Sequence, residues 1–455
     1  MFARPLIAAH ERLTATALAL IAAPVGVVAV LSPPAAIAAV VAVAFVVATI
    51  VDLAAGLAMF ASVTFFVLIP GIGASFVSIV KLAGLALLLS LGRTIGRRTL
   101  LQDHPLVGSV AIALVTWAFA SALWAPDVGR ARSRALTLLL SVVLVFIVYS
   151  AVRRARHARW LVYGYVVGAV SSAVVGFATP APSEGDVGRL SGGIGDPNEL
   201  ALVLVPGLAL AFFALPGART SAERWLLVGG AGAIAISLLE TGSRGGLVAL
   251  AVTFGAALVF GGRLRGRVLA SLVVFAALGA AYFVFAAPSQ VTARVTHFTG
   301  GGGSGRTDLW AIARQVAHDH PVTGVGIGNF EAVERSYTSR TTNLPAVDLV
   351  LDETHVVHNT YLELLAELGP LGLASFLLVV GATLGLGWHA VGAFARSGET
   401  DLEMIGRGVL IGLCGMLAAS VFLSAEYEKQ LWLLLGFAAA LAGVADRRPS
   451  PEVDE

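Results

Sequence analysis

The feature that most constrains this chain is a long succession of apolar runs, each about 20 residues long and separated by charges, glycines and prolines. About 20 apolar residues is the length that an α-helix needs to cross the hydrocarbon core of a bilayer. Of the 455 residues, 57% are hydrophobic and only 13% are charged, whereas a soluble globular domain carries about 25% charged residues. The sequence therefore predicts an all-α, polytopic integral membrane protein.

The apolar runs give about 12–14 transmembrane helices. The second and third runs are separated by little more than Asp52, so they predict either one long tilted helix or a hairpin. The first run is expected to be a retained span and not a cleaved signal peptide. The candidate spans are 14–31, 34–51, 53–69, 72–91, 107–124, 133–151, 159–178, 198–215, 224–240, 245–261, 268–286, 368–386, 404–424 and 429–444.

The distribution of arginines gives these spans a direction. Basic residues concentrate in cytoplasmic loops, and alternate loops of this chain are basic if both termini are cytoplasmic. The arginines that agree are Arg93, Arg97, Arg98, Arg153, Arg154, Arg156, Arg159, Arg219, Arg224, Arg263, Arg265, Arg267, Arg396, Arg447 and Arg448. The stretch from Arg130 to Arg134 is the exception, because it falls on the outer side.

Four regions follow from this topology. We expect an N-terminal transmembrane bundle over 1–178 and central transmembrane helices with arginine-bearing outer loops over 179–286. A large extracytoplasmic loop containing short helices covers 287–367, and C-terminal transmembrane helices with a cytoplasmic tail cover 368–455. The net charge of +2 gives no indication of nucleic-acid binding.

The large outer loop begins with a glycine-rich stretch, TGGGGSG at 299–305. It is not a phosphate-binding P-loop, because Arg306-Thr307 follows where Gly-Lys-Ser/Thr is required. A short interfacial helix is expected from Arg306 to His318, capped by Thr307 or Asp308. The segment PVTGVGIGNF at 321–330 is interpreted as a tight turn in preference to a ligand contact. The apolar stripe of the short helix consists of Leu309, Trp310, Ile312, Ala313 and Val316.

The outer loops carry a histidine and three arginines that suit chemistry on an anionic substrate. His358 lies at a helix start, and histidine suits a general base acting on a sugar hydroxyl. Arg189, Arg244 and Arg306 are on the same predicted face, and guanidinium binds phosphate oxygens bidentately. The alternative is that each arginine binds lipid headgroups or a loop carboxylate, which is the preferred interpretation for Arg130 and Arg134.

Three further features leave alternatives open. Asp352, Glu353, His355 and His358 form a cluster, in which the two histidines could share a helical face and bind a metal. However, the His-Glu-x-x-His order and the Asp-x-Asp pair are absent, and no metal or cofactor is predicted. Lys81 lies inside the fourth span and either binds an anion or forms a structural ion pair. The outer loop with Glu426, Glu428 and Lys429 is expected to be solvated.

Four segments, in order, resemble the O-antigen ligase and polymerase superfamily. HNTYLELLAELGPLG (358–372) resembles its His-Asn, nine residues, Gly, two residues, Gly signature. GRLSGGIGDPNELA (188–201) resembles an Arg-x-x-Gly…Pro-Asn segment, and TGSRGGLVAL (241–250) resembles a Ser-Arg-Gly-Gly segment. GRTDLWAIA (305–313) with PVTGVGIGNF resembles an Arg…Trp…Pro-x-x-Gly-x-Gly…Phe segment. The first 180 or so residues match only in being hydrophobic spans.

The resemblance implies an inverting, metal-independent glycosyltransferase of the bacterial cytoplasmic membrane. It implies a donor glycan carried on undecaprenyl diphosphate and a glycan or lipid acceptor, with membrane lipids around the protein. Carried over to this chain, His358 would activate the acceptor hydroxyl. Arg244 and Arg306 would hold the diphosphate, and Arg189 would position donor or acceptor. Asn198, Asn359 and Tyr361 are expected to support the site.

Other functions remain open from the sequence. Polymerisation of repeat units and ligation to a final acceptor share these motifs, as does protein O-glycosylation, which differs in its acceptor. A transporter or flippase for an anionic or lipid-linked substrate is the alternative from another class. Such transporters commonly show inverted repeats, and no motif is repeated between the halves of this chain.

Overall fold

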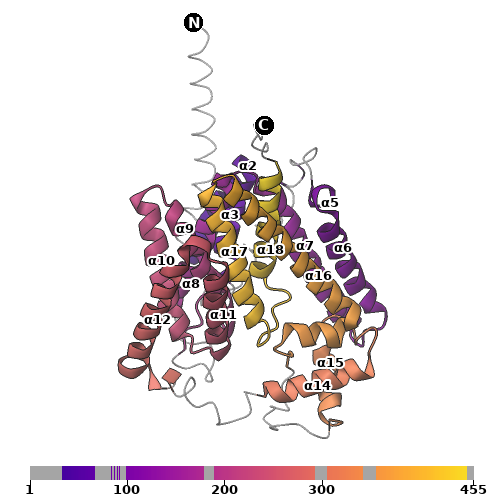
Figure 1. The fold of residues 1–455 in the computed structure, drawn as a ribbon. Coiled ribbons are helices and arrows are strands. Elements are labelled where there is room, and N and C mark those ends of the chain that lie inside the picture. Colours follow the sequence, from indigo (N-terminus) through magenta and orange to yellow (C-terminus); the bar gives the residue numbers. More distant parts are fainter. Residues whose placement is uncertain are drawn as a thin grey trace.

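The computed structural model describes residues 33–66, 84, 87, 90, 92, 99–178, 189–289, 291–292, 305–341 and 355–447. The two predicted spans at 14–31 and 72–91, including Lys81, fall outside these residues, apart from positions 84, 87 and 90. Within the described residues every regular element is a helix (Figure 1). The prediction of an all-α protein is therefore confirmed.

Every predicted span within the described residues corresponds to a helix. Nine of the described helices are long and apolar enough to cross a membrane, and three shorter apolar helices accompany them. The helices are α2 (Pro33–Val51), α3 (Leu53–Val63), α5 (Leu100–Asp103), α6 (Pro105–Ala120), α7 (Val128–Ala151), α8 (Ala155–Ala178), α9 (Pro197–Ala214), α10 (Ser221–Glu240), α11 (Arg244–Phe260), α12 (Arg265–Phe285), α14 (Arg306–Asp319), α15 (Phe330–Thr338), α16 (Thr360–Arg396), α17 (Thr400–Ala419) and α18 (Lys429–Asp446).

The boundary between the second and third spans is a hairpin. Asp52 has an extended backbone (φ −149°), and its side chain accepts a hydrogen bond from the Ala54 N–H and so caps α3. A Cβ added to Gly56 would lie 2.1 Å from Thr49 Oγ1. Seven residues span about 10.5 Å in a continuous helix, so this close approach requires the chain to fold back. The alternative of one long helix is excluded, and α3 ends at Val63, earlier than expected.

Small residues allow the central helices to pack closely. Gly412 and Gly415 of α17 lie against Pro206 and Val205 of α9, so closely that added Cβ atoms would come within 3.0 Å of them. Such contacts are the usual means by which membrane helices associate, because apolar burial alone gives little preference over lipid. The central helix α18 is 83% buried along its apolar window, whereas the peripheral α12 is 11% buried.

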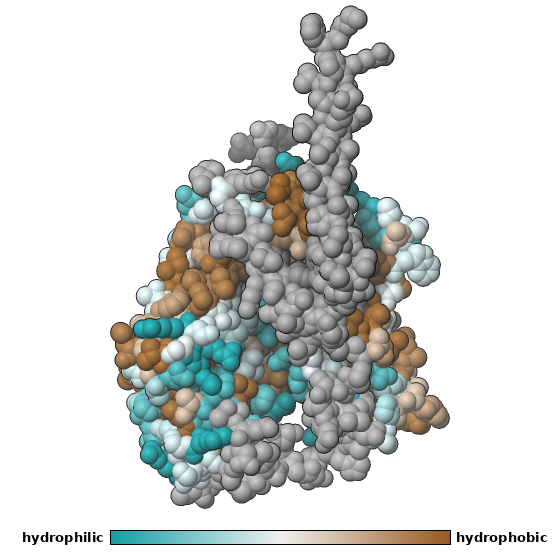
Figure 2. All heavy atoms as spheres, turned by 180° about the vertical axis from the view of Figure 1, so that it is seen from behind, coloured by the Kyte–Doolittle hydropathy of each residue, from teal (hydrophilic) through white to brown (hydrophobic). Residues whose placement is uncertain are grey.

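The bundle has two distinct ends. In Figure 1 the C-terminus lies at the top, and α14 and α15 lie across the bottom. On the face shown in Figure 2, hydrophilic residues gather at the lower left, at the end that carries α14 and α15, while hydrophobic patches lie over the middle of the bundle. We call the end with α14 and α15 the His358 end.

Helix α16 consists of two helices joined by a sharp break at Gly369. This residue has φ 66° and ψ −172°, which are not helical values. It separates a short helix (360–368) from the long one (370–396), which explains why the predicted span begins at 368. A Cβ on Gly369 would lie 2.2 Å from the Val322 carbonyl oxygen. The first glycine of the His-Asn…Gly signature therefore has a packing reason to be glycine.

We expect Gly369→Ala to destabilise the protein. The combination φ 66° and ψ −172° is open essentially to glycine alone and costs another residue about 1–3 kcal/mol, and the clash with the Val322 carbonyl adds to that cost. Thermal unfolding of the purified protein in detergent should show a melting temperature lower by several degrees. Gly381→Ala is the matched control, because Gly381 lies in the same helix with nothing within 4 Å of an added Cβ. Equal melting temperatures for the two variants would contradict the strain at Gly369.

Candidate functional site at the His358 end

The large loop folds onto the bundle through α14 and α15. Helix α14 runs from Arg306 to Asp319, as predicted, and its apolar stripe packs against Phe330, Val357 and neighbouring residues of the loop and of α16. This stripe is covered by protein and does not face the membrane interface. The predicted cap is wrong: Gly305, with φ 73°, precedes the helix in place of Thr307 or Asp308.

Glu367 of α16 holds the segment 321–330 in place. Its carboxylate accepts hydrogen bonds from the Gly328 N–H (2.6 Å) and the Phe330 N–H (3.0 Å). Gly324, Gly326 and Gly328 all have positive φ, which explains the glycine spacing of PVTGVGIGNF. These contacts support the interpretation of this segment as a tight turn.

Arg130 and Arg134, from the stretch that is the exception to the concentration of basic residues in cytoplasmic loops, form ion pairs with Glu331. Arg130 Nη1 lies 2.6 Å from Glu331 Oε2, and Arg134 Nη2 lies 3.6 Å from Glu331 Oε1. The Arg134 guanidinium also stacks over the Tyr427 ring at 5.1 Å. These arginines bind a loop carboxylate, as the preferred interpretation expected.

Arg189 joins the start of α9 to the turn between α10 and α11. Its Nε donates to the Thr241 carbonyl (2.8 Å), and its Nη2 donates to Asn198 Oδ1 (3.1 Å). The same Asn198 oxygen accepts a hydrogen bond from Ser243 Oγ (2.9 Å). Arg189 is only 6% exposed. The structure therefore brings two predicted site residues, Arg189 and Asn198, into one network that fixes the position of the turn before Arg244.

Arg244 and Arg306 are each the first residue of a helix, α11 and α14 respectively. Phe422, between α17 and α18, links the two helix starts. Its side chain lies 3.2 Å from the position of a Cβ on Gly245, and its ring centroid lies 6.3 Å from that of Trp310. Trp310 follows Arg306 by one helical turn, so both arginines are brought to the same region.

His358 immediately precedes the cap of α16. Asn359 Oδ1 accepts hydrogen bonds from the N–H groups of Tyr361 and Leu362, and the Tyr361 hydroxyl donates to the Leu417 carbonyl at 2.8 Å. His358 has φ 53° and is the one non-glycine residue with positive φ among the described residues. Its N–H donates to Ser424 Oγ at 3.1 Å. The two supporting residues, Asn359 and Tyr361, thus fix the helix start that carries His358.

The segment Ser420–Ala425, between α17 and α18, is the point at which these elements meet. The Thr360 N–H donates to the Ser420 and Leu423 carbonyls, both at 3.0 Å. Within the same short connection Glu426 is 1% exposed, so the expectation of a solvated loop is wrong. The Glu426 carboxyl group is therefore covered by protein.

The starts of four helices, α9, α11, α14 and α16, are joined by contacts of Asn198, Phe422 and Ser424. Side chains cap three of these helices: Asp196 caps α9, Ser243 caps α11 and Asn359 caps α16. The partial positive charge of the helix ends, together with the uncapped start of α14, is what favours a bound anion. Asn198, Arg244, Arg306 and Asn359 all lie at these termini. The arrangement of helix ends and two arginines is suited to binding a phosphate-bearing group.

The surroundings of His358 keep its imidazole neutral. Its pKa is lowered to about 4, first by burial and then by the positive charge of Arg306, while the Asp196 carboxylate opposes the shift. A neutral imidazole at pH 7 is able to accept a proton. The electrostatic effects of Arg306 and Asp196 also indicate that both groups lie near the histidine.

For the glycan transfer that the resemblance implies, we expect kcat/KM to remain constant from pH 7 down to about pH 5. Because kcat/KM reports the free enzyme, it should follow the neutral fraction of His358 and fall by about tenfold per pH unit below a midpoint near pH 4. If the base were a histidine with an ordinary pKa of about 6.5, kcat/KM would already fall below that pH. Initial rates at low donor concentration across this pH range provide the measurement. A midpoint of the kcat/KM profile at or above pH 6.5 would contradict the lowered pKa of His358.

The described residues include only two members of the candidate metal cluster, His355 and His358. Asp352 and Glu353 lie outside the described residues. The backbone N–H of His355 donates to Glu334 Oε2 (3.3 Å), and the ring Nδ1 of His355 lies 3.5 Å from Glu334 Oε1. Neither His355 nor His358 lies in a helix, so the expectation of a shared helical face is wrong. In the part of the chain that the structure describes, no group of three His, Cys, Asp or Glu side chains is arranged to hold a metal.

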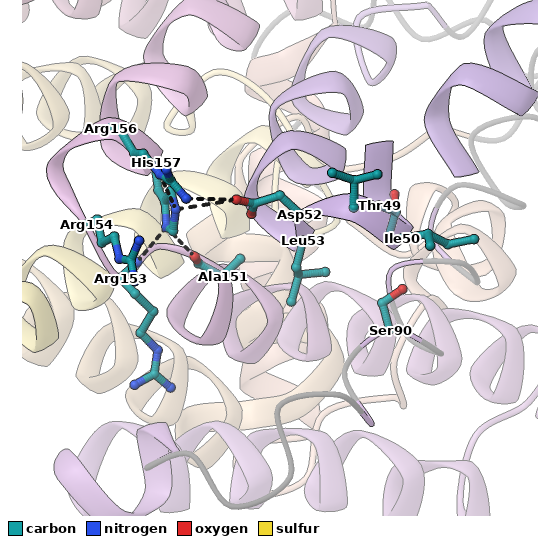
Figure 3. Close-up of a pocket in the computed structure, with 11 residues that line it drawn as sticks. Thr49, Ile50, Asp52, Leu53, Ser90, Ala151, Arg153, Arg154, Arg156 and His157 are labelled. Carbon is teal, nitrogen blue, oxygen red and sulfur yellow. Dashed lines mark hydrogen bonds and ion pairs between the residues drawn. The ribbon is translucent and has the colours of Figure 1, made fainter. Parts of the chain in front are cut away.

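A separate polar cavity of about 490 Å³ lies at the other end of α7 and α8. Figure 3 shows Asp52 beside Arg156 and His157 in its wall. Helix α7 contacts the large loop through its N-cap, Asp127, and reaches this cavity through Ala151. None of the predicted site residues lines it.

The fold and these contacts define a polytopic all-α membrane protein in which arginines and helix N-termini meet near a half-buried histidine. Residues 229–377 match the family model described as O-antigen ligase, which confirms the resemblance to the O-antigen ligase and polymerase superfamily. The match includes Arg244, Arg306, His358, Asn359 and Tyr361, but not Arg189, Asn198 or the segment Ser420–Ala425. No curated protein matches this chain.

Proposed function

We propose that this protein transfers a glycan from an undecaprenyl-diphosphate-linked donor to an acceptor hydroxyl at the outer face of the cytoplasmic membrane. The single observation that best supports this function is that His358 lies near enough to Arg306 for the arginine charge to lower its pKa, at the start of a helix linked to the starts of α9, α11 and α14. A lipid-linked donor holds its diphosphate at headgroup depth, at the ends of the membrane helices. Such a position suits arginines at helix starts.

In the proposed reaction His358 takes the proton of the acceptor hydroxyl. The acceptor oxygen then attacks the anomeric carbon, and the bond from that carbon to the diphosphate oxygen breaks, so that the configuration inverts. The bonding electrons remain on the diphosphate, which leaves as undecaprenyl diphosphate. Arg244 and Arg306 stabilise the charge that grows on it, which is differential binding of the transition state. No metal takes part in this scheme.

Arrival of the donor also makes His358 a stronger base. The positive charge of Arg306 contributes to the low pKa of the free imidazole. A bound diphosphate offsets that charge and raises the pKa toward neutrality, where general bases are most effective. The histidine is therefore ready to accept a proton when the leaving group is in place.

The test is incubation of the purified protein with a synthetic undecaprenyl-diphosphate oligosaccharide, followed by sizing of the products. Chain lengthening indicates a polymerase, and a single addition to another acceptor indicates a ligase. Glycan on protein indicates a protein O-oligosaccharyltransferase. A parallel reaction with EDTA tests metal independence, since loss of activity would contradict it. Transport of the lipid-linked donor in liposomes without any transfer product would contradict the proposed function.

A further inference from the structure

We propose that Ser424 and Glu363 are positioning residues that hold His358 in its working orientation. The inference rests on the proposed role of His358 and deepens it. The His358 N–H donates to Ser424 Oγ at 3.1 Å, and the Ser424 hydroxyl donates in turn to Glu363 Oε2. Neither side chain is proposed to contact the substrate.

The backbone of His358 requires such support. A non-glycine residue in the left-handed region is strained, and such strain persists only where the surroundings enforce it. The direction of each hydrogen bond is fixed by the donors available. The backbone N–H can only donate, so Ser424 Oγ accepts there and turns its own proton toward Glu363. The carboxylate thereby keeps a lone pair of the serine directed at His358.

The rest of the helix start is held by different contacts. Thr360 Oγ1 donates to the Leu423 carbonyl (2.8 Å) and accepts from the Ala425 N–H (2.7 Å). Loss of the Ser424 hydroxyl therefore leaves α16 attached to the segment Ser420–Ala425. Only His358, the residue with positive φ, loses its contact. Its backbone can then relax, and its imidazole can turn away from the acceptor hydroxyl of the substrate.

The test compares Ser424→Ala with Ser420→Ala in the transfer assay. Ser420 is a serine of the same segment, and its hydroxyl donates only to the Met416 carbonyl of its own helix. We expect Ser424→Ala to lower kcat by about 10–100-fold, the scale of a misplaced catalytic group, and to leave the KM for the donor unchanged. Ser420→Ala should retain wild-type kcat. Ser424→Thr restores a hydroxyl and should recover most of the lost activity.

Glu363 is tested by a pair of substitutions of similar volume. Glu363→Gln keeps an oxygen that accepts from Ser424 and should retain most of the activity. Glu363→Met removes this acceptor and also the acceptor of the Val357 backbone N–H, so it should lose at least as much activity as Ser424→Ala. Wild-type kcat in Glu363→Met or in Ser424→Ala would overturn the role of that residue, as would equal losses in Ser424→Ala and Ser420→Ala.

A measurement independent of transfer separates this inference from the proposed function. In protein with isotopically labelled histidine, the His358 ring signal is assigned by its absence in His358→Asn. Ser424→Ala should shift that signal, and Ser420→Ala should leave it in place. An unchanged signal in Ser424→Ala overturns the positioning role. A wild-type protein that transfers no glycan overturns the proposed function, and the signal still decides the positioning of His358.

Discussion

Replacement of His358 should lower kcat by about 10²–10⁴-fold, the contribution of a general base, and leave the KM for the lipid-linked donor nearly unchanged. The neutral imidazole is the proposed acceptor for the proton of the hydroxyl, whereas the donor is held by the arginines. Alanine alone is an incomplete test, because position 358 has φ 53°. Asparagine tolerates the left-handed region better than other non-glycine residues, and it does not act as a base at neutral pH.

We therefore expect His358→Asn to fold like the wild type and to lose as much activity as His358→Ala. The matched control is His320→Ala, which removes an exposed histidine of the same large loop and should retain wild-type kcat. Initial rates with purified protein and synthetic donor, together with melting temperatures, provide the measurement. Full activity of His358→Asn would exclude His358 as the base.

The periodic features of this protein were predictable from the sequence. Each apolar run within the described residues specified a helix because one segment forms all of its own backbone hydrogen bonds in lipid. The extent of α14 followed from its apolar spacing, and the tight turn before Arg244 followed from the short distance between two runs. These are local properties, so a single sequence carries them.

Features that depend on contacts between distant segments were not predictable. The positive φ of His358 is maintained by Ser424, which is 66 residues away. The burial of Glu426 likewise could not be predicted, because a short segment rich in charged residues is expected to be solvated. The role of Glu367 depends on a turn that lies 37 to 39 residues earlier in the chain. Sequence identified the candidate base and arginines, and the structure shows how other residues hold them.

Replacement of Arg306 should have the second large effect. Arg306→Ala is expected to lower kcat/KM by about 10²–10³-fold, which is the typical result of removing one group that stabilises developing negative charge. The guanidinium lies at the positive end of α14 and influences the charge state of His358. Its loss therefore weakens the binding of the leaving group and also removes one cause of the low pKa at His358.

Two comparisons make the Arg306 prediction specific. Arg306→Lys should restore only part of the activity, because an ammonium group lacks the bidentate geometry of guanidinium. Arg314→Ala removes an exposed arginine from the same helix and should leave the rate unchanged. Binding of undecaprenyl diphosphate, measured without any glycan transfer, should weaken in Arg306→Ala and not in Arg314→Ala. Equal affinity of the two variants for that product would show that Arg306 does not hold the diphosphate, and it would leave Arg244 and the helix N-termini as the groups that bind it.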